Sequence, residues 1–82
     1  MMETGYVLFN LKPGTKKDFL EKLRKVKAVK EVRLVIGNFD AIAKIETESI
    51  EELEKIYLND IERISNITNA RLHFVACPRT RK

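Results

Sequence analysis

Four consecutive residues near the middle of the chain combine groups that could hold a small zwitterion. Gly37 and Asn38 lie between two apolar runs and predict a turn, and Phe39 and Asp40 follow it. Exposed backbone N–H groups at such a turn can bind a carboxylate, and an aspartate can bind an ammonium group. The turn would then hold both ends of an α-amino acid. A local interpretation stands beside this one, because aspartate near a turn accepts backbone N–H bonds and glycine supplies a positive φ.

Other residues that carry chemistry are few. His73 is the single histidine and Cys77 the single cysteine, so neither a structural zinc site nor an internal disulfide is expected. The chain has no phosphate-binding loop, dinucleotide fingerprint or nucleophile elbow. We therefore predict no metal, no cofactor and no enzymatic activity. Only His73 and Asp40 are candidates for acid–base chemistry.

The whole-chain numbers describe one small domain. With 82 residues, the chain lies near the lower limit for a single core, so self-association is a plausible way to bury more surface. No apolar run approaches the ~18 residues that a membrane-spanning helix needs. The first residues do not form a signal peptide. These features predict a cytoplasmic protein without a membrane partner.

The net charge of +4 is unevenly distributed. Basic side chains gather over residues 16–30 and in the tail 79–82, whereas acidic side chains gather over residues 46–62. Mixed faces of this kind are usually solvated surfaces, so we expect no specific DNA binding. A basic protein associated with nucleic acid remains an alternative, which steeply salt-dependent binding to duplex DNA would support.

The apolar patterning predicts four strands and two helices. We place the strands over residues 6–11, 29–36, 41–45 and 71–76. A first helix begins after Thr15, which is expected to cap it. A second helix begins at Ser49, where Glu52 completes a capping-box pattern. The expected buried stripes of the two helices are Phe19, Leu20, Leu23 and Val26, and Ile50, Leu53, Tyr57, Ile61 and Ile64.

The two halves of the chain are similar at an offset of 38 residues. Val26 and Val29 correspond to Ile64 and Ile67. The element order is βαββαβ, and right-handed crossovers place both helices on one face of a four-stranded antiparallel sheet. The sequence therefore predicts an α+β, ferredoxin-like fold.

Such a sheet leaves one face uncovered. Alternation along the first strand directs Val7, Phe9 and Leu11 towards the helices. The residues expected on the uncovered face are Tyr6, Leu8, Asn10, Arg33, Val35, His73 and Val75. This mixture is typical of an interface between two sheets, which predicts a homodimer.

With these residues in place, the chain resembles the effector-binding (RAM) domain of the Lrp/AsnC family of transcription regulators. The resemblance runs from about Gly5 to Val75 and is carried by residues 6–14, 29–32 and 35–40. At the last of these sites the family shows a glycine, one variable residue, an aromatic residue and an aspartate. The motifs occur here in the same order and spacing.

The resemblance implies a ligand-binding domain over residues 1–78, followed by the basic tail 79–82. Family members dimerise through their sheets, and the dimers associate into rings, commonly octamers. Small effectors, usually amino acids, bind between dimers near the central turn. By this carry-over Gly37, Asn38, Phe39 and Asp40 form the effector site. Backbone groups would hold the carboxylate, and Asp40 would fix the turn or contact the ammonium group.

The chain also departs from the family pattern. Full-length members carry an N-terminal helix-turn-helix, whereas this chain begins with a strand, so we expect a stand-alone domain. It would either co-assemble with full-length regulators or sense a metabolite for another partner. Ile36, Ala70 and Leu72 occupy places where hydroxyl residues are frequent, so fewer polar anchors are expected. The remaining alternative is a small dimeric ferredoxin-like enzyme of the monooxygenase type.

Overall fold

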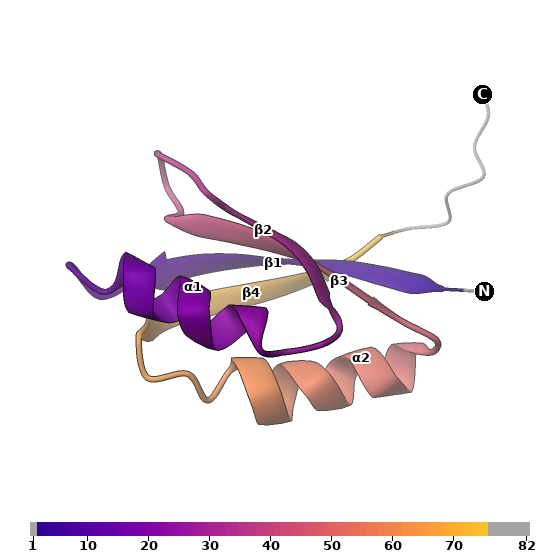
Figure 1. The fold of residues 1–82 in the computed structure, drawn as a ribbon. Coiled ribbons are helices and arrows are strands. Elements are labelled where there is room, and N and C mark those ends of the chain that lie inside the picture. Colours follow the sequence, from indigo (N-terminus) through magenta and orange to yellow (C-terminus); the bar gives the residue numbers. More distant parts are fainter. Residues whose placement is uncertain (1, 76–82) are drawn as a thin grey trace.

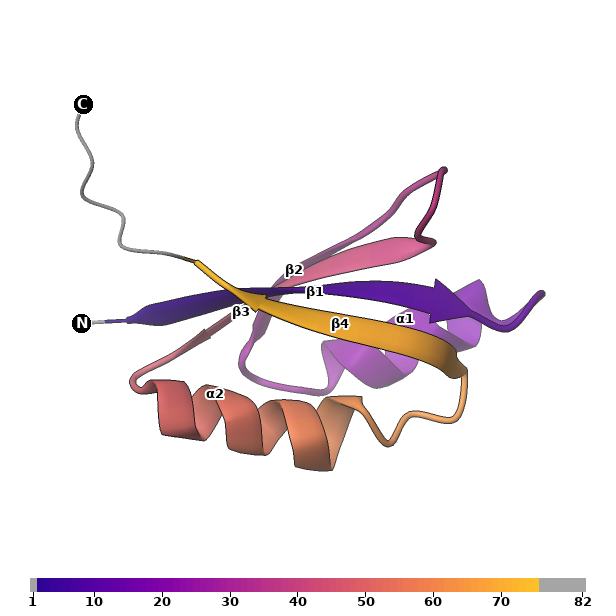
Figure 2. The same cartoon turned by 180° about the vertical axis from the view of Figure 1, so that it is seen from behind.

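The fold was obtained as a computed structural model, which describes residues 2–75. Its elements are β1 (Glu3–Leu11), α1 (Lys16–Arg24), β2 (Val29–Leu34), β3 (Ala41–Thr47), α2 (Ile50–Ile56), a π-helical turn η1 (Tyr57–Ile61) and β4 (Ile67–Phe74). The four strands form one sheet in the order β2-β3-β1-β4, with every neighbouring pair antiparallel. Both helices lie on the same side of the sheet (Figures 1 and 2). The predicted ferredoxin-like arrangement is confirmed.

The core lies between the sheet and the two helices. Val7, Phe9 and Leu11 are buried there, as the alternation along β1 predicts. Phe9 packs edge-on against Phe19 of α1, with ring centroids 4.9 Å apart. Such aromatic pairs add to the free energy gained by burying their apolar area. Leu53 of α2 completes the layer from the other helix.

The two helices begin differently. The Ser49 hydroxyl accepts a hydrogen bond from the Glu52 amide at 3.1 Å, which confirms the predicted cap of α2. The predicted cap at Thr15 is wrong. Its hydroxyl donates to the Lys12 carbonyl at 2.7 Å and forms no cap bond with α1. The hydroxyl closes the preceding turn, and Thr15 has φ −114° and ψ 10° instead of the extended conformation typical of a capping residue.

The second helix is shorter than predicted and ends irregularly. It passes into η1, where the Glu62 amide donates to the Tyr57 carbonyl at 2.7 Å. Leu53, Tyr57 and Ile61 are buried as predicted, whereas Ile50 is 46% exposed because it lies in the first turn. No helix within residues 2–75 is long and apolar enough to cross a membrane.

The internal repeat is confirmed by matching hydrogen bonds after each helix. These bonds run from Val26 N to Leu23 O and from Ile64 N to Ile61 O, and then from Val29 N to Val26 O and from Ile67 N to Ile64 O. Each pair is related by the offset of 38 residues. The same turn therefore leads from α1 into β2 and from η1 into β4.

The strand ends differ from those predicted because pairing partners set them. β1 begins at Glu3 instead of Tyr6, since Glu3 pairs with Thr47 of β3. β4 begins at Ile67, since that residue pairs with Leu11 of β1. β2 ends at Leu34 instead of Ile36. The predicted last strand residue Ala76 lies outside the described residues, as do Cys77 and the tail.

Candidate functional site

The loop between β2 and β3 contains the four predicted site residues and projects beyond the sheet (Figure 1). The Val35 amide donates to the Asp40 carbonyl at 2.9 Å and closes its base. Ile36 is fully exposed. Gly37 has φ +146°, and no atom lies within 4 Å of the place that a Cβ would take. The backbone conformation, not lack of space, therefore requires glycine at this position.

Asp40 fastens this loop to β1. Its Oδ2 atom accepts a hydrogen bond from the Leu11 amide at 2.8 Å. Its own amide donates to the Phe9 carbonyl at 2.8 Å. These are the contacts that the local interpretation of Asp40 predicts. The aspartate thus positions the loop, whatever else its carboxylate contacts.

Asn10 provides a second attachment, which the sequence did not single out. Its Nδ2 atom donates to the Asn38 carbonyl at 2.8 Å. Its Oδ1 atom accepts from Asn69 Nδ2 of β4 at 3.4 Å. The signal available in the sequence was the alternation that places Asn10 on the uncovered face. Two side-chain amides therefore connect the loop to β1 and β4.

The tip of the loop offers unused backbone donors. The amides of residues 36–39 form no backbone–backbone hydrogen bond with another residue among 2–75. Gly37 and Asn38 are exposed and Phe39 is half-buried. Neighbouring backbone N–H groups of this kind can bind an anion such as a carboxylate. The predicted amide donors thus lie on the loop without a backbone acceptor among residues 2–75, and Asp40 is engaged on the side facing β1.

The open face of the sheet, opposite the helices, is the second candidate. Strand register places Tyr6 between Lys44 and His73, and Leu8 between Ile42 and Arg71. The sequence had assigned Tyr6, Leu8 and His73 to this face but missed Ile42, Lys44 and Arg71. Their places depend on the pairing of distant strands. Val35 and Val75, also assigned to it, lie beyond the ends of β2 and β4.

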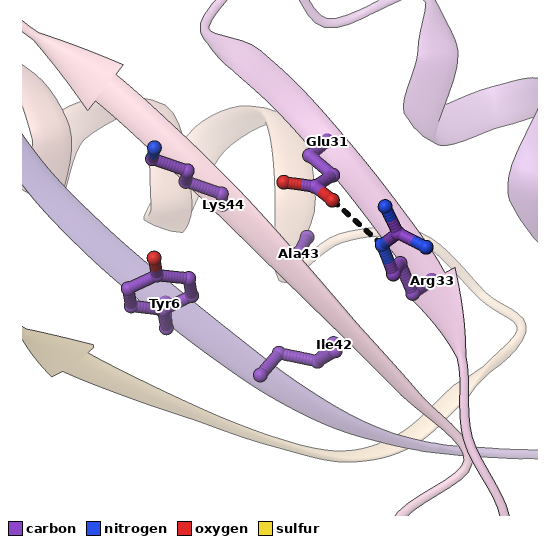
Figure 3. Close-up of a pocket in the computed structure, with 6 residues that line it drawn as sticks. All are labelled: Tyr6, Glu31, Arg33, Ile42, Ala43 and Lys44. Atoms are coloured by element: carbon purple, nitrogen blue, oxygen red, sulfur yellow. Dashed lines mark hydrogen bonds and ion pairs between the residues drawn. The ribbon is translucent and has the colours of Figure 1, made fainter.

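A shallow depression of about 140 Å³ lies on this open face (Figure 3). Its lining residues are Tyr6, Glu31, Arg33, Ile42, Ala43 and Lys44. Arg33 Nε lies 2.6 Å from Glu31 Oε2, and Lys44 Nζ lies 3.5 Å from Glu46 Oε2. The face therefore carries paired charges around apolar side chains. None of the lining residues comes from the β2–β3 loop.

The two candidate acid–base residues are not brought together. His73 pairs with Tyr6 in the first half of β1, whereas Asp40 contacts Leu11 at its end. His73 is exposed. Residues 2–75 also contain no cluster of three or more His, Cys, Asp and Glu side chains that could hold a metal ion.

The shifted pKa values belong to structural contacts. The Asn66 amide, which donates to Asp18 Oδ2 at 3.1 Å, and the neighbouring Lys22 ammonium lower the pKa of Asp18. Burial raises the pKa of Tyr57, whose hydroxyl donates to the Ala70 carbonyl at 3.3 Å. Both groups link a helical segment to another part of the fold. Neither lies in the β2–β3 loop.

Comparison with known proteins identifies a family whose model matches most of the chain. A family model described as the Lrp/AsnC ligand binding domain matches residues 4–78. PF0250 from Pyrococcus furiosus, an uncharacterized HTH-type transcriptional regulator, is 30% identical over 67 residues. This match covers 78% of the present chain and 45% of that protein. The chain thus spans about half the length of this curated relative.

Solved structures share the fold over nearly the whole chain. The crystal structure of FFRP-DM1 superposes with a TM-score of 0.85 at 26% identity, covering 89% of this chain and 97% of that one. The transcriptional regulator NMB0573 from Neisseria meningitidis, solved as a complex with L-Met, superposes with a TM-score of 0.84 at 14% identity. That match covers 96% of this chain and 53% of the regulator. At such low identity the second likeness shows the fold alone.

Proposed function

Because the chain belongs to the Lrp/AsnC ligand-binding domain family, we propose that it is a non-enzymatic, effector-binding and oligomerisation module of the transcription-regulator type. The observation that carries this proposal is the β2–β3 loop, with its cluster of unpaired amides. Sequence recognition of DNA would belong to a separate domain or to full-length regulators with which the module assembles.

The proposed effector is an amino acid or a similarly small carboxylate. The amides of residues 36–39 would bind its carboxylate, and the exposed Ile36 side chain would contact its apolar part. The L-Met complex of NMB0573 supports this class of ligand by analogy of fold. Asp40 would act mainly by holding the loop in place, since its Oδ2 atom already accepts a hydrogen bond from the Leu11 amide.

The proposed assembly is a homodimer formed by two open faces, which can build further into a ring. The paired charges and apolar side chains of the open face support this interface. A small domain gains core volume by such burial. An effector that binds only the assembled form would stabilise it by mass action.

A panel of amino acids tests the sensing role. A ligand at 100 times its Kd adds about 2.7 kcal/mol of stability, which should raise the melting temperature by about 10–20 °C. Gly37→Val, which disturbs the tip of the β2–β3 loop, should reduce this ligand-induced rise. The control variant Leu34→Ala, at an exposed position outside the loop tip, should keep it. A full panel that shifts neither the melting temperature nor the particle mass would reject the sensing role.

Light scattering tests the dimer separately. Ile42→Glu places a charge in the centre of the open face and should yield a monomer. Leu34→Glu, at a more exposed position on the other side of the sheet, should keep the wild-type mass. An Ile42→Glu protein that retains the wild-type mass would show that the open face is not the interface.

A further inference from the structure

A hollow of about 300 Å³ lies beside α2, on the helix side of the domain. It is lined mainly by the α1–β2 turn, the β3–α2 turn and α2 itself. These turns lie away from the β2–β3 loop (Figures 1 and 2). β3 runs from that loop at Ala41 to the hollow at Thr47, which is roughly 20 Å of strand. This helix-side hollow is therefore separate from the loop and from the open face.

Charged side chains of both signs line the helix-side hollow. Lys27 and Lys30 come from the α1–β2 turn and the start of β2, whereas Glu48 and Glu52 come from the β3–α2 turn and α2. None of these four forms an ion pair with another residue among 2–75. A further lining residue, Glu46, is paired with a lysine of β3. The four remaining charges cancel, so the hollow favours a ligand that carries a group of each sign.

The internal repeat supplies a counterpart of this hollow in the other half of the domain. The Glu46 amide donates to the Ala28 carbonyl at 3.0 Å, and the Lys12 amide donates to the Asn66 carbonyl at 2.9 Å. Ala28 and Asn66 are related by the same offset of 38 residues that relates the two turns. Each hydrogen bond therefore joins a strand end to the turn that follows a helix.

The counterpart is filled by a side-chain amide that lies between opposite charges. Asn66 is buried, its Nδ2 atom donates to Asp18 Oδ2 at 3.1 Å, and its Oδ1 atom accepts from Lys22 Nζ at 3.1 Å. Asp18 is the third residue of α1, and Glu52 is the third residue of α2. Ala28 has no polar side chain to reach Glu52, and the hollow opens between them. The helix-side hollow thus lacks the dipolar group that its counterpart contains.

We propose that the helix-side hollow binds a small aliphatic zwitterion, such as an amino acid, between its lysine and glutamate side chains. The carboxylate of the ligand would face the lysines and its ammonium group the glutamates, as the Asn66 amide faces Lys22 and Asp18. Ile56 and Met2 line the same hollow and would contact the apolar part of the ligand. An anion alone would meet the glutamates, and a cation alone would meet the lysines. This site does not depend on the effector role of the β2–β3 loop.

A matched series of compounds tests the ligand class. L-Valine, isovalerate and isobutylamine share a branched apolar part, but the second lacks the ammonium group and the third lacks the carboxylate. The amide chemical shifts of isotope-labelled protein report where each compound binds. L-Valine should shift the amides of Ala28, Lys30 and Glu48, which line the hollow. Each singly charged compound should bind there at least about tenfold more weakly, because the hydrogen bonds to one set of charges are lost.

Filling the hollow with a side chain provides a second test. Ala28→Asn supplies in this half the amide that Asn66 supplies in the other, and that amide should take the place of the ligand. The variant should keep the wild-type circular dichroism spectrum. It should lose the response of Lys30 and Glu48 to L-valine.

Removing one charge at a time tests both sets of charged residues. Lys30→Gln and Glu48→Gln should each weaken L-valine binding by about threefold to tenfold, since charge-assisted hydrogen bonds are roughly twice as strong as neutral ones. The controls Lys25→Gln and Glu54→Gln remove the same charges from exposed positions outside the lining. They should bind L-valine as tightly as wild type does.

The proposal is overturned by three results. One is the absence of L-valine-dependent shifts around the helix-side hollow. Another is isovalerate or isobutylamine that binds there as tightly as L-valine. The third is a folded Ala28→Asn protein that keeps the L-valine response of the hollow. Shifts confined to Gly37 and Asn38 would reject this site and support the proposed effector site, so the two failures are distinguishable.

Discussion

Replacing Asp40 with alanine should destabilise the domain, because its carboxylate holds the β2–β3 loop against β1. Oδ2 accepts the Leu11 amide at 2.8 Å, and Leu11 is 7% exposed. Removing a charged acceptor from a buried donor costs about 1.5–3 kcal/mol. A domain of this size loses about 4–8 °C per kcal/mol. We expect the melting temperature to fall by about 6–24 °C.

Two further variants separate hydrogen bonding from charge. Asp40→Asn keeps an oxygen acceptor without the charge and should cost about half as much, since charge-assisted bonds are roughly twice as strong as neutral ones. Asp60→Ala removes the same charge from an exposed position in η1. It should change stability by no more than about 0.5 kcal/mol.

Thermal unfolding followed by circular dichroism at neutral pH measures all three. If Asp40→Ala melts within about 2 °C of Asp60→Ala, the carboxylate does not anchor the loop and the assignment fails. The same samples, melted with and without an effector, test whether Asp40 also contacts the ammonium group of the effector. An asparagine variant that keeps the ligand-induced shift marks Asp40 as a positioning residue, whereas loss of that shift indicates contact with the ammonium group.

Three smaller perturbations test the packing that positions the site. Gly5→Val should lower the free energy of unfolding by about 1–3 kcal/mol in a urea titration, because a Cβ at Gly5 would lie 3.2 Å from the Leu53 side chain. A valine at an exposed strand position would meet no such neighbour. Ser49→Ala should cost about 1 kcal/mol by loss of the α2 cap, and Ser49→Asp should restore most of it. Since the pKa of Asp18 is lowered from 3.8 in the fold, its contacts stabilise above that pH and are lost as the pH falls through the folded value. An Asp18→Asn variant should therefore show less acid destabilisation below about pH 4 than wild type in pH-dependent melting, and identical acid profiles would contradict the assignment.

The features that could be predicted from sequence are those that depend on near neighbours. The alternation of Val7, Phe9 and Leu11 has the period of a strand, so the side facing the helices follows directly. The Ser49 cap needs only residues within one helical turn. The repeat could also be found, because both halves form the same turn after the helix.

The features that were missed depend on residues far apart in the chain. Ile42, Lys44 and Arg71 join the open face only through the register of β1 with its two neighbours. Asn66 looks like a helix end in sequence, yet it is buried and contacts Asp18, 48 residues away. The π-helical turn at Tyr57 likewise has no local signal. Its tyrosine hydroxyl reaches Ala70 in β4, which shows that tertiary packing accompanies this turn.

Asn10 connects the open face of the sheet to the β2–β3 loop. It therefore gives a physical basis for the proposed linkage between effector binding and assembly. Its neighbours on alternate positions of β1, Leu8 and Tyr6, belong to the open face, whereas its Nδ2 atom donates to the Asn38 carbonyl in the loop. Its Oδ1 atom accepts from Asn69 of β4. Covering the open face would restrict the Asn10 side chain and, through it, the backbone that presents the unpaired amides. Because linkage is reciprocal, a ligand that orders the loop would favour the covered face by the same free energy.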